Sequence, residues 1–575
     1  MRQTVRLSHA FLATLLAASV TVLATRGPNT RQTVDATKLS GTWDVSLHET
    51  DGVEIEFRMT FKVANAAPLR WEAYSRAGAA REMVSGSVAF LGRLSGKMPP
   101  HEALIYIGDG TAEERGDVLT LKGSLESPFL GKRDFNGTLV NQVIHADLTR
   151  ASSTTKAGTM EFVRSDSTQP LRDYAAIAVR LEQAIRSTLF DPALVENRDF
   201  AKFFVELKQR FGAARDDLDA IAAFQALKGT LRISHLDLIR NPRLASRSLE
   251  EVIAGDKESN PDTFVRFGFP APGVAVLRVT KWDRVDAAID QAFERIDKAQ
   301  SRVLLFDIRG NPGGDATSMA PLAHLVNRPV TIGTFLGRKW YATHRAAPTA
   351  DELFNLRSIG SDTNPSLLFS ELRDHGALVA KVLPRAPYFA GAVYLLVDHV
   401  TASASEPLAH ALLRAGRATL IGERTSGSML LALPHSIGEG WIVTIPEADF
   451  VAADGLRLEG KGVEPNLKCA PGDVYLTAAE QFAAMLPFSA ALVRGQSFES
   501  LKQAAEAEKS YRAALRVANQ QNPAPTTKSI ALVHKRLAVI LKAKDDQAGA
   551  LAEYKEVLKL VPDDAEALAA VRANK

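Results

Sequence analysis

A serine at position 403 stands where a buried strand is expected to turn into a helix. The apolar run GAVYLLVD at 391–398 predicts the strand, and SEPLAHALLRA at 405–415 has helical spacing. A serine in such a turn presents its hydroxyl above the sheet, where free N–H groups of the helix start can stabilise an oxyanion. Ser403 is therefore a candidate nucleophile. The alternative is an ordinary capping box, because Glu406 follows three residues later and Pro407 is tolerated in a first helical turn.

A glycine-rich loop, DIRGNPGGD at 307–315, follows a second apolar run, RVLLFD. The adjacent Gly313 and Gly314 let the backbone approach a ligand closely and direct N–H groups at negative charge. A phosphate-binding loop is the alternative, but neither the Walker spacing with its lysine nor the dinucleotide glycine pattern is present. The loop is better suited to donate hydrogen bonds to an oxyanion.

Four motifs then occur in a fixed order: DIRGNPGGD at 307–315, TASASE at 401–406, IGERTSG at 421–427 and EGKGVEP at 459–465. This order resembles the tail-specific (C-terminal processing) protease family of serine peptidases, and the similarity spans about residues 231–475. The resemblance implies a serine-type peptidase with Ser403 as nucleophile. It also implies an oxyanion hole formed by the N–H of Ala404 together with Gly313 or Gly314.

The general base departs from the familiar members of that family, which place a lysine 25 positions after the nucleophile. Here that position is Ser428, and the stretch IGERTSGSMLLAL contains no lysine. Arg424 cannot replace it, because a guanidinium stays protonated. The chain is more similar to a branch that resembles the tricorn protease core, in which a Ser-His pair lies upstream and a glutamate downstream.

The resemblance to that branch assigns roles to three further residues. His235 would be the base that takes the proton of Ser403, while Ser234 and Glu459 would orient and support it. An imidazole suits this role because its ordinary pKa of about 6.5 lies near working pH.

Each of these residues also has a purely structural explanation. A single histidine on a strand, here expected within LRISHLDL at 231–238, is usually a satisfied polar residue, and Glu459 could be a surface carboxylate. His399 and His435 are alternative bases. Asp307 and Arg309 are better explained as shaping the glycine loop than as taking part in the chemistry.

The pattern of hydrophobic residues predicts the elements that would position these groups. Short alternating segments at 38–165 predict an antiparallel β-sandwich or barrel, and helical spacing dominates a subdomain at 170–255 that carries the Ser-His strand. Strands alternate with helices at 260–480, which predicts a catalytic α/β core with a mixed, mostly parallel sheet and crossover helices. The fold class is therefore α/β with an N-terminal all-β domain, a helical subdomain and a C-terminal helical repeat.

The C-terminal residues 495–575 show spacing typical of tetratricopeptide repeats. Leu537, Ala538, Ala550, Tyr554 and Pro562 stand where that pattern requires them, although a plain amphipathic hairpin would have similar spacing. So short an array seldom stands alone, so we expect it to dock on the protease body or on a protein partner.

The first 24 residues predict a secretion signal, with basic Arg2 and Arg6 before an apolar run that is short for a bilayer span. The protein is then expected to be exported, to a bacterial periplasm or beyond, or anchored if the signal is not cleaved. No later segment is apolar enough to span a membrane. The one cysteine, Cys469, excludes an intramolecular disulfide, and a net charge of +3 without basic clusters argues against nucleic-acid binding.

These observations together predict an exported serine endopeptidase that cleaves peptides or unfolded proteins without metal or cofactor. Only about 38 residues separate His235 from Gly273, too few for the PDZ domain that many family members insert there. The main alternative is a catalytically inactive peptide- or lipid-binding protein on the same fold. A second is an interaction scaffold built on the helical repeat and the β domain.

Overall fold

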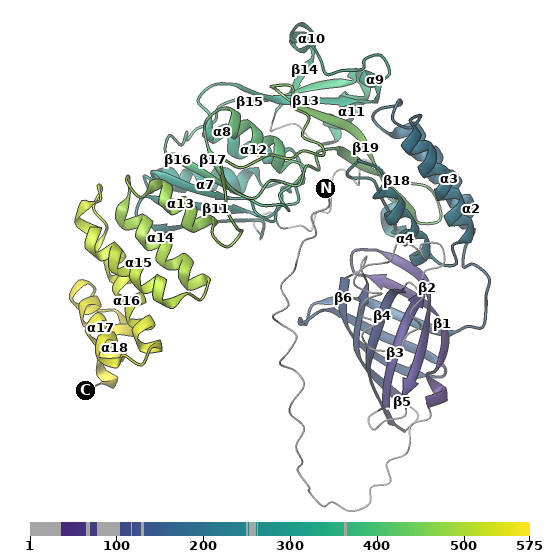
Figure 1. Cartoon of the computed structure of the whole chain (residues 1–575), viewed down its shortest axis with the longest axis horizontal. Helices are drawn as coiled ribbons and strands as arrows, with labels where there is room; N and C mark the ends of the chain where they lie inside the picture. Colours follow the sequence, from purple (N-terminus) through teal and green to yellow (C-terminus); the bar gives the residue numbers. More distant parts are fainter. Residues whose placement is uncertain are drawn as a thin grey trace, which may run out of the picture.

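The structure is a computed structural model that describes residues 36–64, 69–76, 104–116, 118–127, 131–248, 251, 260, 263–360 and 365–574. The predicted signal at 1–24 lies outside the described residues, as does the predicted subdomain boundary at 255. The barrel and the C-terminal helices lie at opposite ends of an arch, with the α/β sheets between them (Figure 1).

Eight antiparallel strands form a closed barrel at the N-terminal end, in which each strand pairs with the next and β1 pairs with β8. The alternating pattern thus closes as a barrel rather than as a sandwich. The strands are β1 (Gly41–Glu49), β2 (Glu54–Ala64), β3 (Leu69–Arg76), β4 (Leu104–Arg115), β5 (Val118–Ser127), β6 (Gly131–Val140), β7 (Val143–Arg150) and β8 (Lys156–Arg164), preceded by the short helix η1 (Ala36–Lys38). Aromatic side chains fill the interior, among them Trp43, Phe57, Trp71 and Phe162, all buried.

Three helices coincide with the predicted helical subdomain: α2 (Tyr174–Thr188), α3 (Arg198–Ala213) and α4 (Asp217–Lys228). They share one hydrophobic core with the barrel. The buried carboxylates of Asp216 and Asp217, at the start of α4, accept hydrogen bonds from the backbone N–H groups of Arg58 and Glu56 on β2. Helix α4 is therefore fixed to the barrel just before the chain reaches Ser234.

The predicted strand at 231–238 is wrong. Residues 231–236 form a turn, and strand β9 covers only Asp237–Arg240, followed by the short helix α5 (Pro242–Ala245). His235 has a φ of 57°, in the left-handed region that a strand cannot accommodate. Leu231 and Leu236 are buried without strand pairing, whereas Leu238, in β9, pairs with Val443 of a neighbouring strand.

The α/β core contains a six-stranded sheet in the order β10-β11-β12-β16-β17-β20, in which every pair except β10–β11 is parallel. Its strands are β10 (Val265–Ala271), β11 (Val274–Val279), β12 (Val303–Asp307), β16 (Ala392–Val397), β17 (Thr419–Gly422) and β20 (Leu467–Lys468). One face is covered by α7 (Asp286–Lys298), η3 (Ala316–Met319), α8 (Ala320–Leu325) and α12 (Ser405–Arg414). This mostly parallel arrangement matches the prediction and places the carboxyl ends of β12 and β16 side by side, where a site is expected.

A second, mixed sheet was not predicted from the hydrophobic pattern. Its order is β14-β15-β13-β19-β18, and β9 pairs with β19 as well. The strands are β13 (Val330–Gly337), β14 (Arg357–Ile359), β15 (Ala377–Val382), β18 (Leu431–Ser436) and β19 (Trp441–Ala452), with helices α9 (Arg338–Tyr341), α10 (Ala350–Asn355) and α11 (Pro365–His375) in the same region. Strand β19 is almost wholly buried although it contains Glu447 and Asp449, so it shows no alternation that would reveal it.

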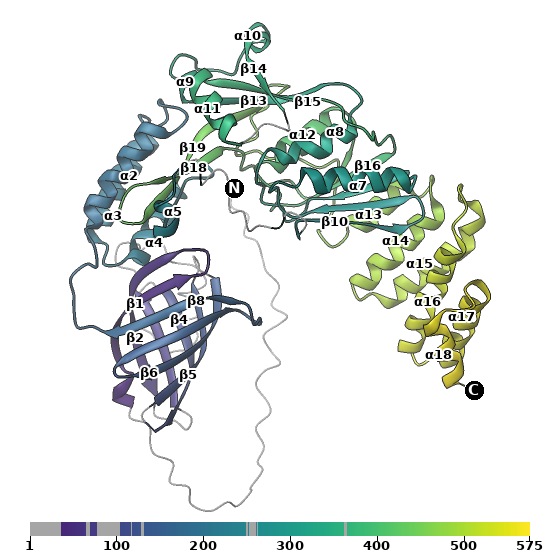
Figure 2. The ribbon, with the colours of Figure 1, turned by 180° about the vertical axis from the view of Figure 1, so that it is seen from behind.

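The first two of the C-terminal helices pack on the face of the parallel sheet opposite α7 and α12, and the others extend from them (Figure 2). They are α13 (Val474–Phe482), α14 (Pro487–Ser500), α15 (Ala504–Val517), η4 (Ala518–Gln520), α16 (Thr527–Ala543), α17 (Gln547–Leu560) and α18 (Ala565–Ala573). Phe482 and Tyr511 belong to the same buried cluster as Val303 and Tyr394 of the sheet, so this segment is docked on the α/β core. The assignment to the tetratricopeptide class stays a prediction. Among the described helices, none has the length and apolar character needed to cross a bilayer.

Candidate active site

Ser403 lies in the tight turn between β16 and α12, two residues before the helix begins. The helix has Ala404 as its N-cap and no side-chain cap, so the hydroxyl of Ser403 does not serve as a helix cap. Ser403 has a φ of 54°, a left-handed conformation that costs a non-glycine residue of order 1–3 kcal/mol. In the described part of the chain no hydrogen bond occupies its Oγ. A partly buried hydroxyl is therefore held free in a strained turn, as a nucleophile would be.

The glycine loop after β12 lies directly against this turn. A Cβ on Gly313 would stand 2.5 Å from Cβ of Ser403 and 3.0 Å from its Oγ, and one on Gly314 would stand 1.8 Å from the carbonyl oxygen of Trp282. Their φ values, 106° and 140°, also favour glycine. The carbonyl of Asn311 accepts a 3.1 Å hydrogen bond from the N–H of Ala402, which joins the two loops. Any larger residue at 313 would displace Ser403.

The backbone N–H groups near Ser403 differ in their availability. The N–H of Gly313 donates to the side-chain oxygen of Asn311 at 2.8 Å and is already engaged. The N–H groups of Gly314 and Ala404 make no hydrogen bond within the described residues. The sequence analysis named Gly313 or Gly314 as the glycine of the oxyanion hole. Of the two, Gly314 has the N–H group that is available.

Ser234, His235 and Glu459 form a continuous chain of hydrogen bonds, here called the relay. The hydroxyl of Ser234 donates to Oε2 of Glu459 at 2.8 Å, and its backbone N–H donates to Oε1 at 2.7 Å. Oγ of Ser234 is also 2.8 Å from Nδ1 of His235. A carboxylate can only accept, and the hydroxyl has one proton, so Nδ1 must carry the hydrogen that Ser234 accepts. The lone pair of His235 is then on Nε2, the nitrogen that a general base would use.

One peptide group connects the relay to the nucleophile turn. The carbonyl of Ser428 accepts a 2.9 Å hydrogen bond from the N–H of Ser403, and the N–H of Met429 donates at 2.8 Å to Oε2 of Glu459. The carbonyl of Ser428 and the N–H of Met429 belong to the same planar peptide group. One side of this group is therefore bonded to Ser403 and the other to Glu459 of the relay. Residues 234–235 and 403, far apart in the sequence, therefore belong to one hydrogen-bonded network.

Burial changes the proton affinity of the histidine. Desolvation, with a smaller contribution from the nearby Lys228 charge, lowers the pKa of His235 below its ordinary value. The neutral imidazole is consequently favoured at neutral pH, which is the form that can accept a proton.

Glu406 is a functional candidate that the sequence reasoning did not identify, because it treated this residue as half of a capping box. Its buried carboxylate accepts hydrogen bonds from the Thr425 hydroxyl at 2.6 Å and from the N–H groups of Gly427, Ser428 and Ser403 at 2.8, 2.9 and 3.2 Å. Burial raises the pKa of Glu406, against these hydrogen bonds. The sequence signal that could have revealed it is a single carboxylate in the mostly apolar stretch SEPLAHAL at 405–412. It holds the 425–428 loop against the nucleophile turn.

We expect Glu406→Gln to destabilise the fold by about 1–3 kcal/mol, because the amide NH2 would oppose at least one of the N–H donors and leave it unpaired. The carbonyl of Ser428 should shift with the loop, and turnover should fall at least about tenfold. Urea unfolding and a proteolysis assay measure the two effects. Glu423→Gln is the matched control, since that carboxylate is less buried and pairs with the exposed His399. Equal stability of the two variants would contradict the role given to Glu406.

The alternative bases lie elsewhere. Nδ1 of His399 is 2.7 Å from Glu423, and its side chain is 74% exposed. His435 contacts Glu447 at 3.0 Å through Nε2. Neither histidine takes part in the network that joins Ser403 to Glu459.

Asp307 and Arg309 anchor the glycine loop, as the sequence suggested. The buried carboxylate of Asp307 accepts from Arg309 at 2.8 Å and from the hydroxyl of Tyr475 at 2.9 Å, and it is paired with Arg278. Burial alone would raise the pKa of Asp307, but the two guanidinium groups outweigh it and hold that pKa below its ordinary value. Among the described residues, the hydrogen-bond and ion-pair partners of Asp307 include neither Ser403 nor a residue of the relay, which favours a structural role for the pair.

Comparison with known proteins places this site in a family. Residues 273–469 match the model of peptidase family S41, so this part of the chain is an S41 peptidase domain, of the serine-type hydrolases. The matched range contains Ser403, Gly314 and Glu459, whereas Ser234 and His235 lie before it.

Two curated relatives agree with this family. The chain is 29% identical over 110 residues to carboxyl-terminal-processing peptidase 1, chloroplastic, of Arabidopsis thaliana, which covers 19% of this chain and 22% of the relative. It is 22% identical over 196 residues to the carboxy-terminal processing protease CtpA of Bacillus subtilis, covering 34% of each. The chain therefore matches no more than about a third of the length of either relative.

Among solved structures, the chain is similar to the photosystem II D1 C-terminal processing protease, with 15% identity, a TM-score of 0.34 and coverage of 52% of this chain and 94% of that one. It is also similar to the tricorn protease, with 11% identity, a TM-score of 0.30 and coverage of 72% and 52%.

Proposed function

We propose that this protein is an exported serine endopeptidase that cleaves peptides or unfolded proteins through an acyl-enzyme on Ser403. The observation that carries the proposal is the relay of Glu459, Ser234 and His235, joined to Ser403 by the 428–429 peptide group. The S41 match of residues 273–469 supports a peptidase, and the apolar run at 10–24 supports export.

The proposed reaction begins when Nε2 of His235 accepts the proton of the Ser403 hydroxyl as Oγ attacks the scissile carbonyl. The N–H groups of Gly314 and Ala404 donate to the oxyanion that forms. The imidazolium then protonates the leaving amine, which departs and leaves an ester on Oγ. Water, deprotonated by the same imidazole, hydrolyses the ester and restores Ser403.

Within this reaction Glu459 and Ser234 act as positioning residues. The carboxylate holds the Ser234 hydroxyl, and that hydroxyl fixes the imidazole with its hydrogen on Nδ1. The negative charge of Glu459 is linked to the His235 ring through two hydrogen bonds. It also favours the imidazolium that forms when His235 takes the proton of Ser403.

A fluorophosphonate probe tests whether the chain is an enzyme. We expect the full-length protein to be labelled stoichiometrically at Ser403, with labelling lost in Ser403→Ala. Ser428→Ala is the matched control, because among the described residues the hydroxyl of Ser428 hydrogen-bonds only to Ser426, while its backbone makes the contacts to the site. An inert wild-type protein would favour the alternative, a peptide- or lipid-binding protein without catalysis.

A further inference from the structure

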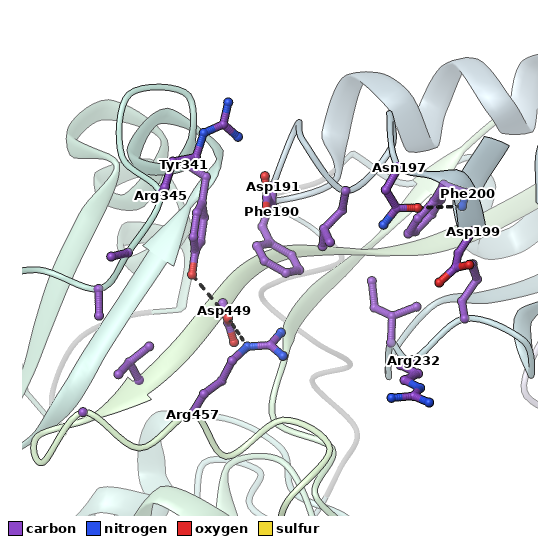
Figure 3. A pocket seen from close by; sticks show the side chains of 17 residues that line it. Phe190, Asp191, Asn197, Asp199, Phe200, Arg232, Tyr341, Arg345, Asp449 and Arg457 are labelled. Carbon is purple, nitrogen blue, oxygen red and sulfur yellow. Dashed lines mark hydrogen bonds and ion pairs between the residues drawn. The ribbon is translucent and has the colours of Figure 1, made fainter.

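A hollow of about 390 Å³ lies between the helical subdomain and the second sheet (Figure 3). One wall comes from the segment after α2 and from α3, and includes Phe190, Leu194 and Phe200. The opposite wall comes from α9 and the loop after it, including Tyr341. Pockets of this size commonly bind a ligand group.

The hollow adjoins the relay through two segments. Leu231, Arg232 and Ile233 line it and immediately precede Ser234 and His235 in the chain. Gly455 and Arg457 line it as well, and Arg457 stands two residues before Glu459. Both of these segments continue directly into the relay, so the hollow and the proposed base are carried by the same two stretches of chain.

The wall that contains Phe190, Leu194 and Phe200 is apolar and aromatic. Phe190 and Phe200 are buried, and the ring of Phe190 packs edge-on against that of Tyr341 with centroids 5.5 Å apart. Leu194 and Ile233 are only half-buried, and both line the hollow. Such an apolar lining is suited to a ring or a branched aliphatic side chain, which packs edge-to-face or by dispersion.

The charged groups at the hollow offset one another. Asp449 is paired with Arg457 and accepts a hydrogen bond from the hydroxyl of Tyr341, so these groups satisfy each other (Figure 3). The remaining lining charges are those of two arginines and two aspartates: Arg232, Arg345, Asp191 and Asp199. Because these positive and negative charges are equal in number, a charged ligand group would gain little from them. The choice of side chain therefore depends on the apolar residues of the hollow.

We propose that this hollow is a specificity pocket that binds one large apolar side chain, aromatic or branched aliphatic, of the polypeptide substrate near the bond to be cut. The inference rests on the proposed peptidase function. It adds the class of side chain that is selected and the residues that select it.

The experiment compares two tryptophan variants of the full-length protein. Ala347 lines the hollow, whereas Ala342, which is also exposed and lies five residues earlier in the chain, does not. A peptide library is digested by each protein and the cleavage sites are read by mass spectrometry. We expect the wild type to prefer large apolar residues over small polar ones at one position by about tenfold or more. Ala347→Trp should abolish that preference, while Ala342→Trp keeps it.

Fluorophosphonate labelling of Ser403 separates this inference from the function on which it rests. Labelling should proceed within about twofold of the wild-type rate in both variants, since neither residue touches the relay. Cleavage without an apolar preference, or a preference that Ala347→Trp leaves intact, would overturn the pocket assignment alone. A wild-type protein that neither labels nor cleaves would overturn the peptidase proposal, and the pocket assignment with it.

Discussion

Ser403→Ala is expected to lower turnover of an unstructured protein substrate by about five to six orders of magnitude. The variant lacks the hydroxyl of Ser403, which makes no hydrogen bond within the described residues and is the proposed attacking group. Without it no acyl-enzyme can form. Release of fluorescent fragments from a labelled, unfolded protein measures the effect. Residual activity within tenfold of the wild type would exclude Ser403 as the nucleophile.

A stability measurement on variants of Ser403 would distinguish a loss of the reacting hydroxyl from a loss of folded protein. Because Ser403 has a φ of 54°, Ser403→Gly should relieve backbone strain and raise the free energy of unfolding by about 1 kcal/mol. Ser403→Ala keeps a Cβ in the strained conformation and should leave stability nearly unchanged. A glycine variant that is both more stable and inactive would show that the serine hydroxyl is kept in this turn at a cost in stability.

His235→Ala is expected to lower kcat by about three to six orders of magnitude, because Ser403 then has no group to accept its proton. Added imidazole should restore part of the activity by entering the vacated space. His399→Ala is the matched control, since that histidine lies four residues before Ser403 but is exposed and paired with Glu423. A His235 variant that keeps most of its activity would rule out the assigned base.

The pH dependence of the wild-type rate gives the same base a separate signature. The base must be neutral, so kcat/KM should be constant above the pKa of His235 and fall about tenfold per pH unit below it. Burial lowers that pKa, which places the midpoint of the acidic limb below 6.5. A midpoint above 6.5, or a flat profile down to pH 4, would contradict a buried imidazole base.

The elements near the nucleophile were predictable because short-range patterns encode them. The apolar run at 391–398 and the helical spacing at 405–415 correspond to β16 and α12, and the paired glycines correspond to a loop that a Cβ would obstruct. In contrast, the turn that carries His235 was predicted as a strand. Its φ of 57° is imposed by packing, and nothing in the alternation of LRISHLDL signals it.

The sequence alone determined which residues are chemically able to act, because residue type and local spacing are one-dimensional properties. It did not determine which of them meet. The bonds between Ser234 and Glu459 cross 225 positions, and Glu406 reaches the 425–428 loop only after α12 has packed beneath it. Such contacts depend on how two sheets and a helical subdomain stack, since burial of apolar faces brings these distant polar groups together. Only the tertiary structure therefore decided that Ser403, Ser234, His235 and Glu459 belong to one network, and that Glu406 supports it.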